Sequence, residues 1–194
     1  MQLNNDHQQI IDFFDRIYPT TAELRSEIIA CSKLVSYPKR TLLADIGQIH
    51  KNIYFILEGA IRTYYVDRNH DDITSWLLFE GDLAISVYSF YNQAPSFEAM
   101  ETLADTRALV LSYDTLMWLY NKYMEFNFIG RTLTEAYYIK SEEKANALRM
   151  LTAKERYEQL LSLYPMILRR VPLRYIASYL GITQSTLSRI RSQK

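Results

Sequence analysis

Residues 172–194 read PLRYIASYLGITQSTLSRIRSQK, and this stretch predicts two short helices joined at a glycine. Pro172 suits the first position of a helix, because the N–H that proline lacks has no intrahelical partner there. Small and apolar side chains would form the face that the second helix covers: Ile176, Ala177 and Leu180. Gly181 supplies the backbone freedom that a tight turn needs. The stretch therefore predicts a compact helical pair.

The segment after Gly181 predicts the second helix of this pair. Thr183 can cap that helix, and Leu187 and Ile190 would point inward. Four polar side chains share the opposite face at helical spacing: Gln184, Ser185, Ser188 and Arg189. Glutamine and arginine match the edges of adenine and guanine in the DNA major groove, where a good bidentate pair discriminates by about 1–3 kcal/mol. The pattern is typical of a helix-turn-helix that binds DNA, with these four side chains on bases and Arg189 on a guanine.

An amphipathic helical pair that only closes a core would show the same apolar spacing. The distribution of charge favours DNA binding instead. The chain carries 22 basic and 22 acidic residues, but residues 149–194 hold nine basic residues and only two acidic ones, Glu155 and Glu158. Residues 1–148 therefore hold 13 basic and 20 acidic residues. A positive segment on a chain of zero net charge favours contact with phosphates at that segment.

Composition indicates an ordinary globular protein without a membrane span, a metal or a cofactor. Of the 194 residues 48% are hydrophobic, and no run approaches the roughly 20 apolar residues of a spanning helix. The N-terminal MQLNNDHQQI lacks the parts of a signal peptide, so we expect a cytoplasmic location. Cys31 is alone and is expected to be a buried apolar residue. The three histidines show no metal-ligand spacing: His7, His50 and His70.

The first two thirds of the chain change from a helical to a strand-like pattern. Residues 6–31 predict helices, with apolar side chains at helical intervals around a break at Pro19. Residues 34–111 predict short strands, separated by turn signals such as Gly59. The strand-like runs are TLLADIG, NIYFILEG, AIRTYYV, ITSWLLFEG, AMETL and RALVLS. So many short strands predict a compact antiparallel barrel or roll, and hence an α+β protein.

A long helix is predicted after the strands. Ser112 can cap a first helix that begins YDTLMWLYNKY, and a longer one follows over residues 125–151. Apolar side chains on the longer helix are three and four residues apart, as in a helix–helix seam: Phe126, Ile129, Leu133, Ala136 and Tyr137. This helix would be about 40 Å long, so we favour pairing with a second copy of the chain over burial against the chain's own roll. Thr152 and Glu155 then form a capping box, which marks a new helix and a joint that can act as a hinge.

A roll, a long helix and a helix-turn-helix in this order resemble the Crp/Fnr family of bacterial transcription regulators. The resemblance covers nearly the full length and rests on YFILEG at 54–59, FEGD at 79–82, SYDTL at 112–116 and IASYLGITQSTLSRI at 176–190. The runs ERYEQLLSLYP and RVPLRYIASYLGIT look most like the branch of the family from the Bacteroidetes. The resemblance implies three parts: an effector-binding-like roll domain over residues 1–123, a dimerisation helix over 124–151 and a DNA-binding domain over 152–194.

The resemblance also implies partners and a mode of DNA binding. A homodimer would bind a palindromic operator in double-stranded DNA, with half-sites about 34 Å apart, and would contact RNA polymerase. Phosphate contacts are expected from Arg174, Thr183 and Arg191, with Arg169, Arg170 and Lys194 as further candidates. Family members usually continue into a small β-wing after the recognition helix, whereas this sequence ends at Lys194. We therefore expect an absent or truncated wing, modest affinity and a steep dependence on salt.

Family members that bind cyclic AMP hold the ribose with a glutamate and the phosphate with an arginine–serine pair. The corresponding positions here are Ser86 and Ser96–Phe97, and residues 81–103 contain no arginine or lysine. A cyclic phosphate there would lose water without gaining a cationic partner, so we do not expect cyclic nucleotide binding. The tentative effector pocket comprises Ile85, Ser86, Ser96 and Phe97. Its aromatic surroundings suit either a filled core or an uncharged ligand, and the sequence does not identify an effector.

Other functions fit the sequence less well. An iron–sulfur sensor needs about four thiolate ligands, and this chain has one cysteine. His50 and His70 lie in the polar stretches QIHKN and RNHDD and are expected to be exposed rather than to bind haem. An enzyme of the cupin type needs clustered histidines, and no two histidines here are closer than 20 residues. One alternative stays open, a sensor or interaction module whose helix-turn-helix no longer binds DNA.

Overall fold

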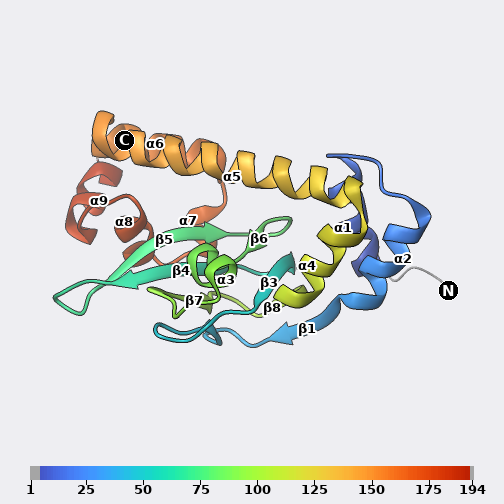
Figure 1. Ribbon diagram of the computed structural model, residues 1–194. Coiled ribbons are helices and arrows are strands. Elements are labelled where there is room, and N and C mark those ends of the chain that lie inside the picture. Colours follow the sequence, from blue (N-terminus) through green and yellow to red (C-terminus); the bar gives the residue numbers. More distant parts are fainter. Residues whose placement is uncertain (1–4, 193–194) are drawn as a thin grey trace.

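The computed structural model describes residues 5–192 and begins with two helices, α1 (Asn5–Asp15) and α2 (Ala22–Cys31) (Figure 1). Helix α2 begins after Thr21, whose hydroxyl accepts a hydrogen bond of 3.2 Å from the N–H of Leu24. The predicted break near Pro19 is confirmed, because it lies between these two helices. Both helices lie at the opposite end of the molecule from the C-terminal helices.

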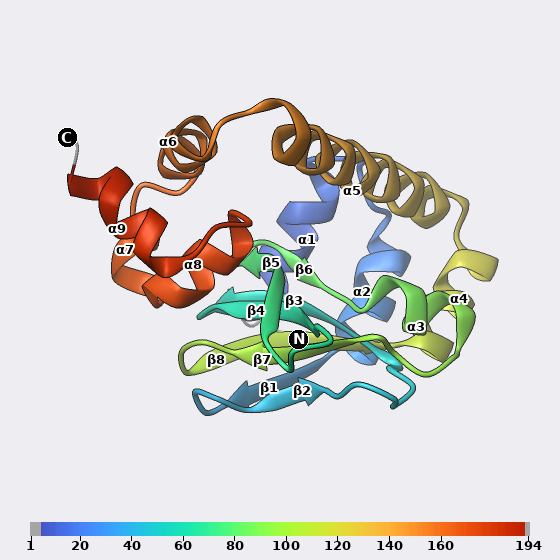
Figure 2. The ribbon, with the colours of Figure 1, turned by 90° about the vertical axis from the view of Figure 1, so that its left-hand side faces the viewer.

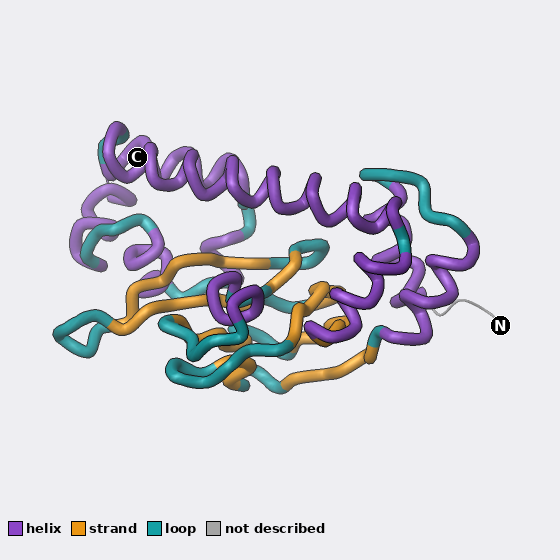
Figure 3. Tube along the Cα trace, viewed as in Figure 1, coloured by secondary structure: helices purple, strands orange, loops and turns teal. Residues whose placement is uncertain are grey.

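The strands form two four-stranded antiparallel sheets that face each other as a roll (Figure 3). One sheet has the order β1-β8-β3-β6 and the other β2-β7-β4-β5. The strands are β1 (Lys33–Tyr37), β2 (Leu42–Ala44), β3 (Asn52–Glu58), β4 (Ile61–Val66), β5 (Asp72–Leu78), β6 (Leu83–Ala84), β7 (Glu98–Thr102) and β8 (Thr106–Ser112). Buried side chains of both sheets fill the space between them, including Ile56, Ile61 and Met100. The predicted roll is confirmed, but β1, β6 and the short helix α3 (Val87–Asn92) were missed.

The turn between β3 and β4 requires glycine at position 59. Gly59 has a φ of 107°, and a Cβ there would lie 2.7 Å from the Cα of Thr106. Its N–H donates to the carboxylate of Glu80 at 2.9 Å, and its carbonyl accepts a hydrogen bond of 2.7 Å from Arg170. The turn is therefore fixed both by close packing and by residues distant in the sequence.

A second core lies between the roll and the helices α1, α2, α4 (Tyr113–Lys122) and α5 (Met124–Met150). Its fully buried side chains include Ile10, Leu24, Ile28, Leu109, Leu119 and Ile129. Helix α4 begins as predicted, because the hydroxyl of Ser112 accepts from the N–H of Thr115 at 3.1 Å. Cys31 packs against this core but is only half-buried. The N-terminal part of α5 is thus anchored on the chain's own core.

Helix α5 is the predicted long helix, and the first part of its apolar stripe packs on the chain's own core. Phe126 and Ile129 are fully buried in the helical core, and Leu133 packs against the same cluster. Further along, the ring of Tyr137 lies 5.2 Å from the ring of Trp76 on β5. The chain's own core thus covers Phe126 and Ile129, whereas Ala136 and Tyr137 are exposed, and pairing of this helix with a second copy stays a prediction. Periodicity shows which face of a helix is apolar but not which partner covers it.

Four helices follow α5 in the described chain: α6 (Ala153–Leu163), α7 (Ile167–Arg170), α8 (Leu173–Tyr179) and α9 (Gln184–Ser192). The predicted capping box is present, because the carboxylate of Glu155 accepts from the N–H of Thr152 at 2.7 Å and the Thr152 hydroxyl accepts from the N–H of Glu155. Pro172 is the cap residue before α8 rather than its first helical residue. Across residues 5–192, the helices are too short or too polar to cross a membrane.

Candidate nucleic-acid interface and effector site

Helices α8 and α9 form a compact pair around buried apolar side chains. The residues that hold the pair together are Ile176, Ala177, Leu180 and Leu187. Gly181 has a φ of 66°, and the next residue, Ile182, donates its N–H to the carbonyl of Ala177 at 3.0 Å. Thr183 then accepts from the N–H of Thr186 at 3.2 Å, which starts α9. The turn and cap predicted for a helix-turn-helix are both present.

The four side chains predicted to contact bases are all exposed on α9: Gln184, Ser185, Ser188 and Arg189. The guanidinium of Arg189 makes one contact of 3.5 Å, to the hydroxyl of Thr186. It forms no ion pair with a carboxylate of the described residues. The face therefore presents hydrogen-bonding groups toward a partner outside the chain.

The candidate phosphate contacts around this face are exposed as well. Arg174, Thr183 and Arg191 lie on the surface, as does Arg169. The guanidinium of Arg174 lies 4.5 Å from the ring of Tyr175 and donates to its hydroxyl at 2.6 Å. Lys194, the remaining candidate at the end of the sequence, lies outside the described residues.

The two serines that the resemblance predicts at the ligand-binding positions, Ser86 and Ser96, bond to each other. The hydroxyls of Ser86 and Ser96 are 3.0 Å apart, and both residues are almost fully buried. The Ser96 hydroxyl also donates to the carbonyl of Glu98 at 2.7 Å and accepts from its N–H at 3.0 Å. Ser96 therefore uses its hydrogen-bonding capacity within the chain.

A buried carboxylate completes this part of the roll. Glu98 is 8% exposed, and the hydroxyl of Ser75 lies 3.5 Å from its carboxylate and 2.5 Å from the hydroxyl of Thr63. Burial raises the pKa of Glu98, and the hydroxyls around it oppose that rise. The sequence analysis missed this residue, although it is the only charged residue between Asp82 and Glu101. A carboxylate at this position would repel a phosphate rather than bind it.

The other two tentative pocket residues, Ile85 and Phe97, have different surroundings. Phe97 is 63% exposed, and its ring packs 4.8 Å from that of Tyr88 on α3. Ile85 is half-buried against the helical core, which includes residues of α5. Their assignment to an effector pocket stays a prediction. Ser86 and Ser96 are the members that the structure brings together.

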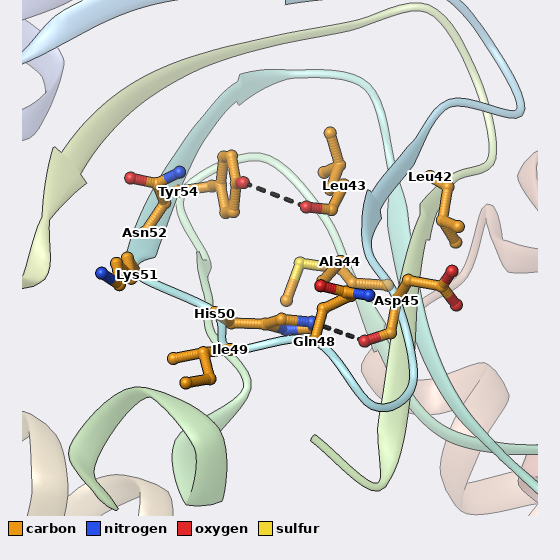
Figure 4. Close-up of a pocket in the computed structure, with 11 residues that line it drawn as sticks. Leu42, Leu43, Ala44, Asp45, Gln48, Ile49, His50, Lys51, Asn52 and Tyr54 are labelled. Atoms are coloured by element: carbon orange, nitrogen blue, oxygen red, sulfur yellow. Dashed lines mark hydrogen bonds between the residues drawn. The ribbon is translucent and has the colours of Figure 1, made fainter. Parts of the chain in front are cut away.

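A separate pocket of about 370 Å³ opens beside the loop between β2 and β3 (Figure 4). His50 in this loop is buried, which contradicts its prediction as an exposed residue. Its Nε2 lies 2.9 Å from the carbonyl of Asp45, and its backbone N–H donates to Ser89. Its Nδ1 has no partner among the described residues. Within residues 5–192 no group of three or more acidic, histidine or cysteine side chains could hold a metal ion.

The helix-turn-helix is packed on the roll around a buried arginine. Arg62 of β4 is 1% exposed, and its guanidinium binds the carboxylates of Asp72 at 2.5 Å and Glu101 at 2.6 Å. The rings of Tyr64 and of Tyr175 on α8 lie 4.0 and 3.7 Å from the guanidinium carbon. Two carboxylates and two aromatic rings thus surround this charge.

Hydrogen bonds connect the C-terminal helices to the same side of the roll (Figure 2). The hydroxyl of Ser178 on α8 accepts from the N–H of Thr74 at 2.8 Å and donates to the carbonyl of Asp72 at 2.9 Å. Arg170 binds both carboxylate oxygens of Glu80 at 2.7 Å. Arg170 is therefore occupied within the chain and is not available to a DNA phosphate in this arrangement.

A family model described as the cyclic nucleotide-binding domain matches residues 34–123, from β1 to the end of α4. The whole structure is similar to a protein of Eubacterium rectale described as a Crp/Fnr transcriptional regulator, with a TM-score of 0.67 and 14% identity. That similarity covers 88% of this chain and 82% of the other. This chain has the Crp/Fnr fold. The predicted resemblance to the Crp/Fnr family is confirmed at the level of the fold, whereas the Bacteroidetes branch stays a prediction.

Two further solved structures are similar to this chain. FixK2 of Bradyrhizobium japonicum has a TM-score of 0.72 and 21% identity, covering 84% of this chain and 83% of that one. CLP of Xanthomonas campestris, a global regulator responsive to c-di-GMP, has a TM-score of 0.69 and 16% identity, covering 89% and 91%. No curated protein sequence matches the chain. The neighbours with a stated role are regulators rather than enzymes, in line with the sequence-based expectation.

Proposed function

We propose that this chain is a sequence-specific DNA-binding transcription regulator of the Crp/Fnr type that does not respond to cyclic AMP. The observation that carries the proposal is the exposed polar face of α9 above a buried helix-turn-helix core. Gln184 and Arg189 would contact an adenine and a guanine, with Ser185 and Ser188 in the same groove. Phosphate contacts would come from Arg174, Thr183 and Arg191.

The interior of the roll supports independence from cyclic AMP. Ser86 and Ser96 stand where the family's ribose and phosphate ligands would be, and they bond to each other. The neighbouring charge is the carboxylate of Glu98, which would repel a phosphate. No arginine or lysine of residues 81–103 can compensate. We therefore expect that cyclic AMP neither binds this roll nor changes DNA binding.

The proposal includes a homodimer that binds a palindromic operator and contacts RNA polymerase. Tyr138 and Ile139 in the middle of α5 are 64% and 56% exposed, so this helix keeps an apolar surface beyond the side that faces the chain's own core. We assign dimerisation to residues 124–151, with the roll domain over 1–123 and the DNA-binding domain over 152–194. Replacing Tyr138 and Ile139 together by glutamate should give monomers in light scattering.

Selection from random duplex DNA by the purified full chain tests the central proposal. The wild-type protein should enrich a palindrome without added ligand at moderate salt. Arg189→Ala should lose that enrichment, because it removes the guanine contact, at a cost of about 1–3 kcal/mol per half-site. Arg16→Ala is a matched control, since Arg16 is exposed beyond α1 at the opposite end of the molecule.

The outcomes separate this function from the alternative of an interaction module. Loss of enrichment in the Arg189 variant but not in the Arg16 variant supports a DNA-binding regulator. Absence of any enriched sequence with the wild-type protein contradicts effector-independent DNA binding and favours the interaction module. An enrichment that cyclic AMP strengthens would contradict the second half of the proposal.

A further inference from the structure

A groove of about 270 Å³ lies at the joint between the roll, α5 and the C-terminal helices. Figures 1 and 2 show α6 and α8 gathered at the C-terminal end of α5, where this joint lies. The walls come from β5, α5, α6, the segment after α6 and the end of α8, and they include Trp76, Lys144, Arg156, Tyr164 and Tyr179. A molecule in the groove would touch every part that the hinge connects.

The groove contains a half-buried lysine, Lys144, whose ammonium has no carboxylate partner among the described residues. Lys144 donates to the backbone carbonyl of Ser75, and its Nζ lies 5.1 Å from the ring of Trp76 and 4.2 Å from the ring of Tyr179. It forms no ion pair with a carboxylate of the described residues. An ammonium has three donors, and a buried charge without a counter-ion is costly.

The other polar groups of the groove do not supply that counter-ion. Arg156 is a cation itself, and its guanidinium is held by the carbonyls of Leu180 at 3.0 Å and Leu151 at 2.6 Å. Lys140 adds a further positive charge, and Glu143 is the only acid in the lining. The groove therefore combines an excess of positive charge with aromatic and aliphatic walls.

We propose that this groove binds a small organic anion with an apolar or aromatic body, whose carboxylate pairs with Lys144 while the body packs on the aromatic walls. Such a ligand supplies the missing counter-ion and covers apolar surface at the same time. Because the walls belong to α5, α6 and α8, the ligand would hold the joint after Leu151 in one arrangement. The binding step does not depend on DNA binding.

The protein carries its own reporter for this test. The chain has two tryptophans, and Trp76 lies in the groove whereas Trp118 lies on α4 beside Lys122. In a Trp118→Phe background, the fluorescence of Trp76 should change saturably with phenylacetate. Phenylacetamide has the same body without the charge and should bind about tenfold more weakly, as expected for a lost charge-assisted contact.

Substitutions at Lys144 test whether the carboxylate of the ligand binds at this residue. Lys144→Met should abolish the preference for phenylacetate over phenylacetamide, whereas Lys144→Arg should keep it. Lys154→Met is the matched control, because Lys154 is exposed on α6 outside the groove and pairs with Glu158. Equal binding of the two probes, no saturation with phenylacetate, or an unchanged preference in the Lys144→Met variant would overturn the proposal.

The pH dependence of phenylacetate binding tests the proposal without a substitution at Lys144. Burial lowers the pKa of Lys144 to about 8, so phenylacetate affinity should fall between pH 7 and pH 9. Desolvation raises the pKa of Tyr179 to about 12 and also raises that of Tyr164, so neither tyrosine loses its proton in this range. Lys140, Glu143 and Arg156 are the other titratable groups that face Lys144 in the groove. An affinity that is flat over this range would contradict pairing with Lys144.

Discussion

Arg62 and Lys144 are two cations at the boundary between the roll and the C-terminal helices, and their surroundings differ. Arg62 is fully buried, whereas Lys144 is half-buried. Arg62 has the carboxylates of Asp72 and Glu101 within 2.6 Å and lies between two tyrosine rings. Lys144 has two aromatic rings and one backbone carbonyl but no carboxylate among the described residues. The boundary thus contains one region whose charge is neutralised within the chain and one whose charge is not.

This difference separates a structural contact from a binding site. A buried charge that is paired inside the chain has nothing to gain from a ligand, and removing its partners leaves charges uncompensated. A buried charge without a partner is tolerated at a cost, and an external counter-ion reduces that cost. We therefore expect the Arg62 region to stabilise the fold and the Lys144 region to respond to pH and to ligands.

Arg62→Met should have the largest effect on stability. It leaves the carboxylates of Asp72 and Glu101 without their shared cation and removes the stacking on both rings, so we expect a loss of about 3 kcal/mol in the free energy of unfolding. Urea unfolding followed by circular dichroism measures this loss. Arg107→Met is the matched control, because Arg107 also has two acidic partners but is 41% exposed, and should cost less than about 1 kcal/mol. Equal losses of unfolding free energy in the two variants would contradict the expected difference between a buried and an exposed arginine.

Lys144 should make stability rise with pH in a range where Arg62 has no effect. Its pKa of about 8 lies below the ordinary value of 10.5, so the unfolded chain binds more protons than the folded chain between these two values. Stability should therefore increase by about 2 kcal/mol between pH 7 and pH 9.5. Lys144→Met should lack this increase, as measured by urea midpoints at each pH. A parallel pH profile in the two proteins would show that Lys144 is not desolvated.

The coupling between Arg62 and Tyr175 is the smallest expected effect and sharpens the comparison. Tyr175→Leu removes the ring that α8 contributes, and a double-mutant cycle with Arg62→Met isolates the interaction. We expect a coupling energy of about 1 kcal/mol, typical of a cation–π contact away from water. A coupling near zero in urea unfolding would mean that α8 is held to the roll by other contacts.

Local signals allowed much of the fold to be predicted from the sequence. The cap at Ser112, the capping box at Thr152 and the turn at Gly181 each depend on a few neighbouring residues, and each was found in the expected place. The strands predicted from alternating patterns were also found, whereas β1 and α3 lack such a strong pattern. Long-range packing was beyond these signals, as the apolar stripe of α5 shows.

The residues of the candidate sites also fall into those that local signals predict and those that depend on long-range packing. The exposed face of α9 follows from helical spacing within nine residues, so Gln184 to Arg189 could be placed from the sequence. The family resemblance singled out Ser86 and Ser96, but it predicted neither the hydrogen bond between them nor the nearby carboxylate of Glu98. Arg62 could not be recognised, because its partners lie on β5, β7 and α8, far apart in the sequence.

The contact between Ser178 and β5 also bears on aggregation. Strand β5 is an edge strand of its sheet, and unpaired N–H and carbonyl groups on such an edge can recruit a strand from another molecule. Ser178 occupies the N–H of Thr74 and the carbonyl of Asp72, so α8 covers this edge. Any movement that lifts the helix-turn-helix from the roll would uncover it. The solubility of this protein is thereby linked to the position of its DNA-binding helices.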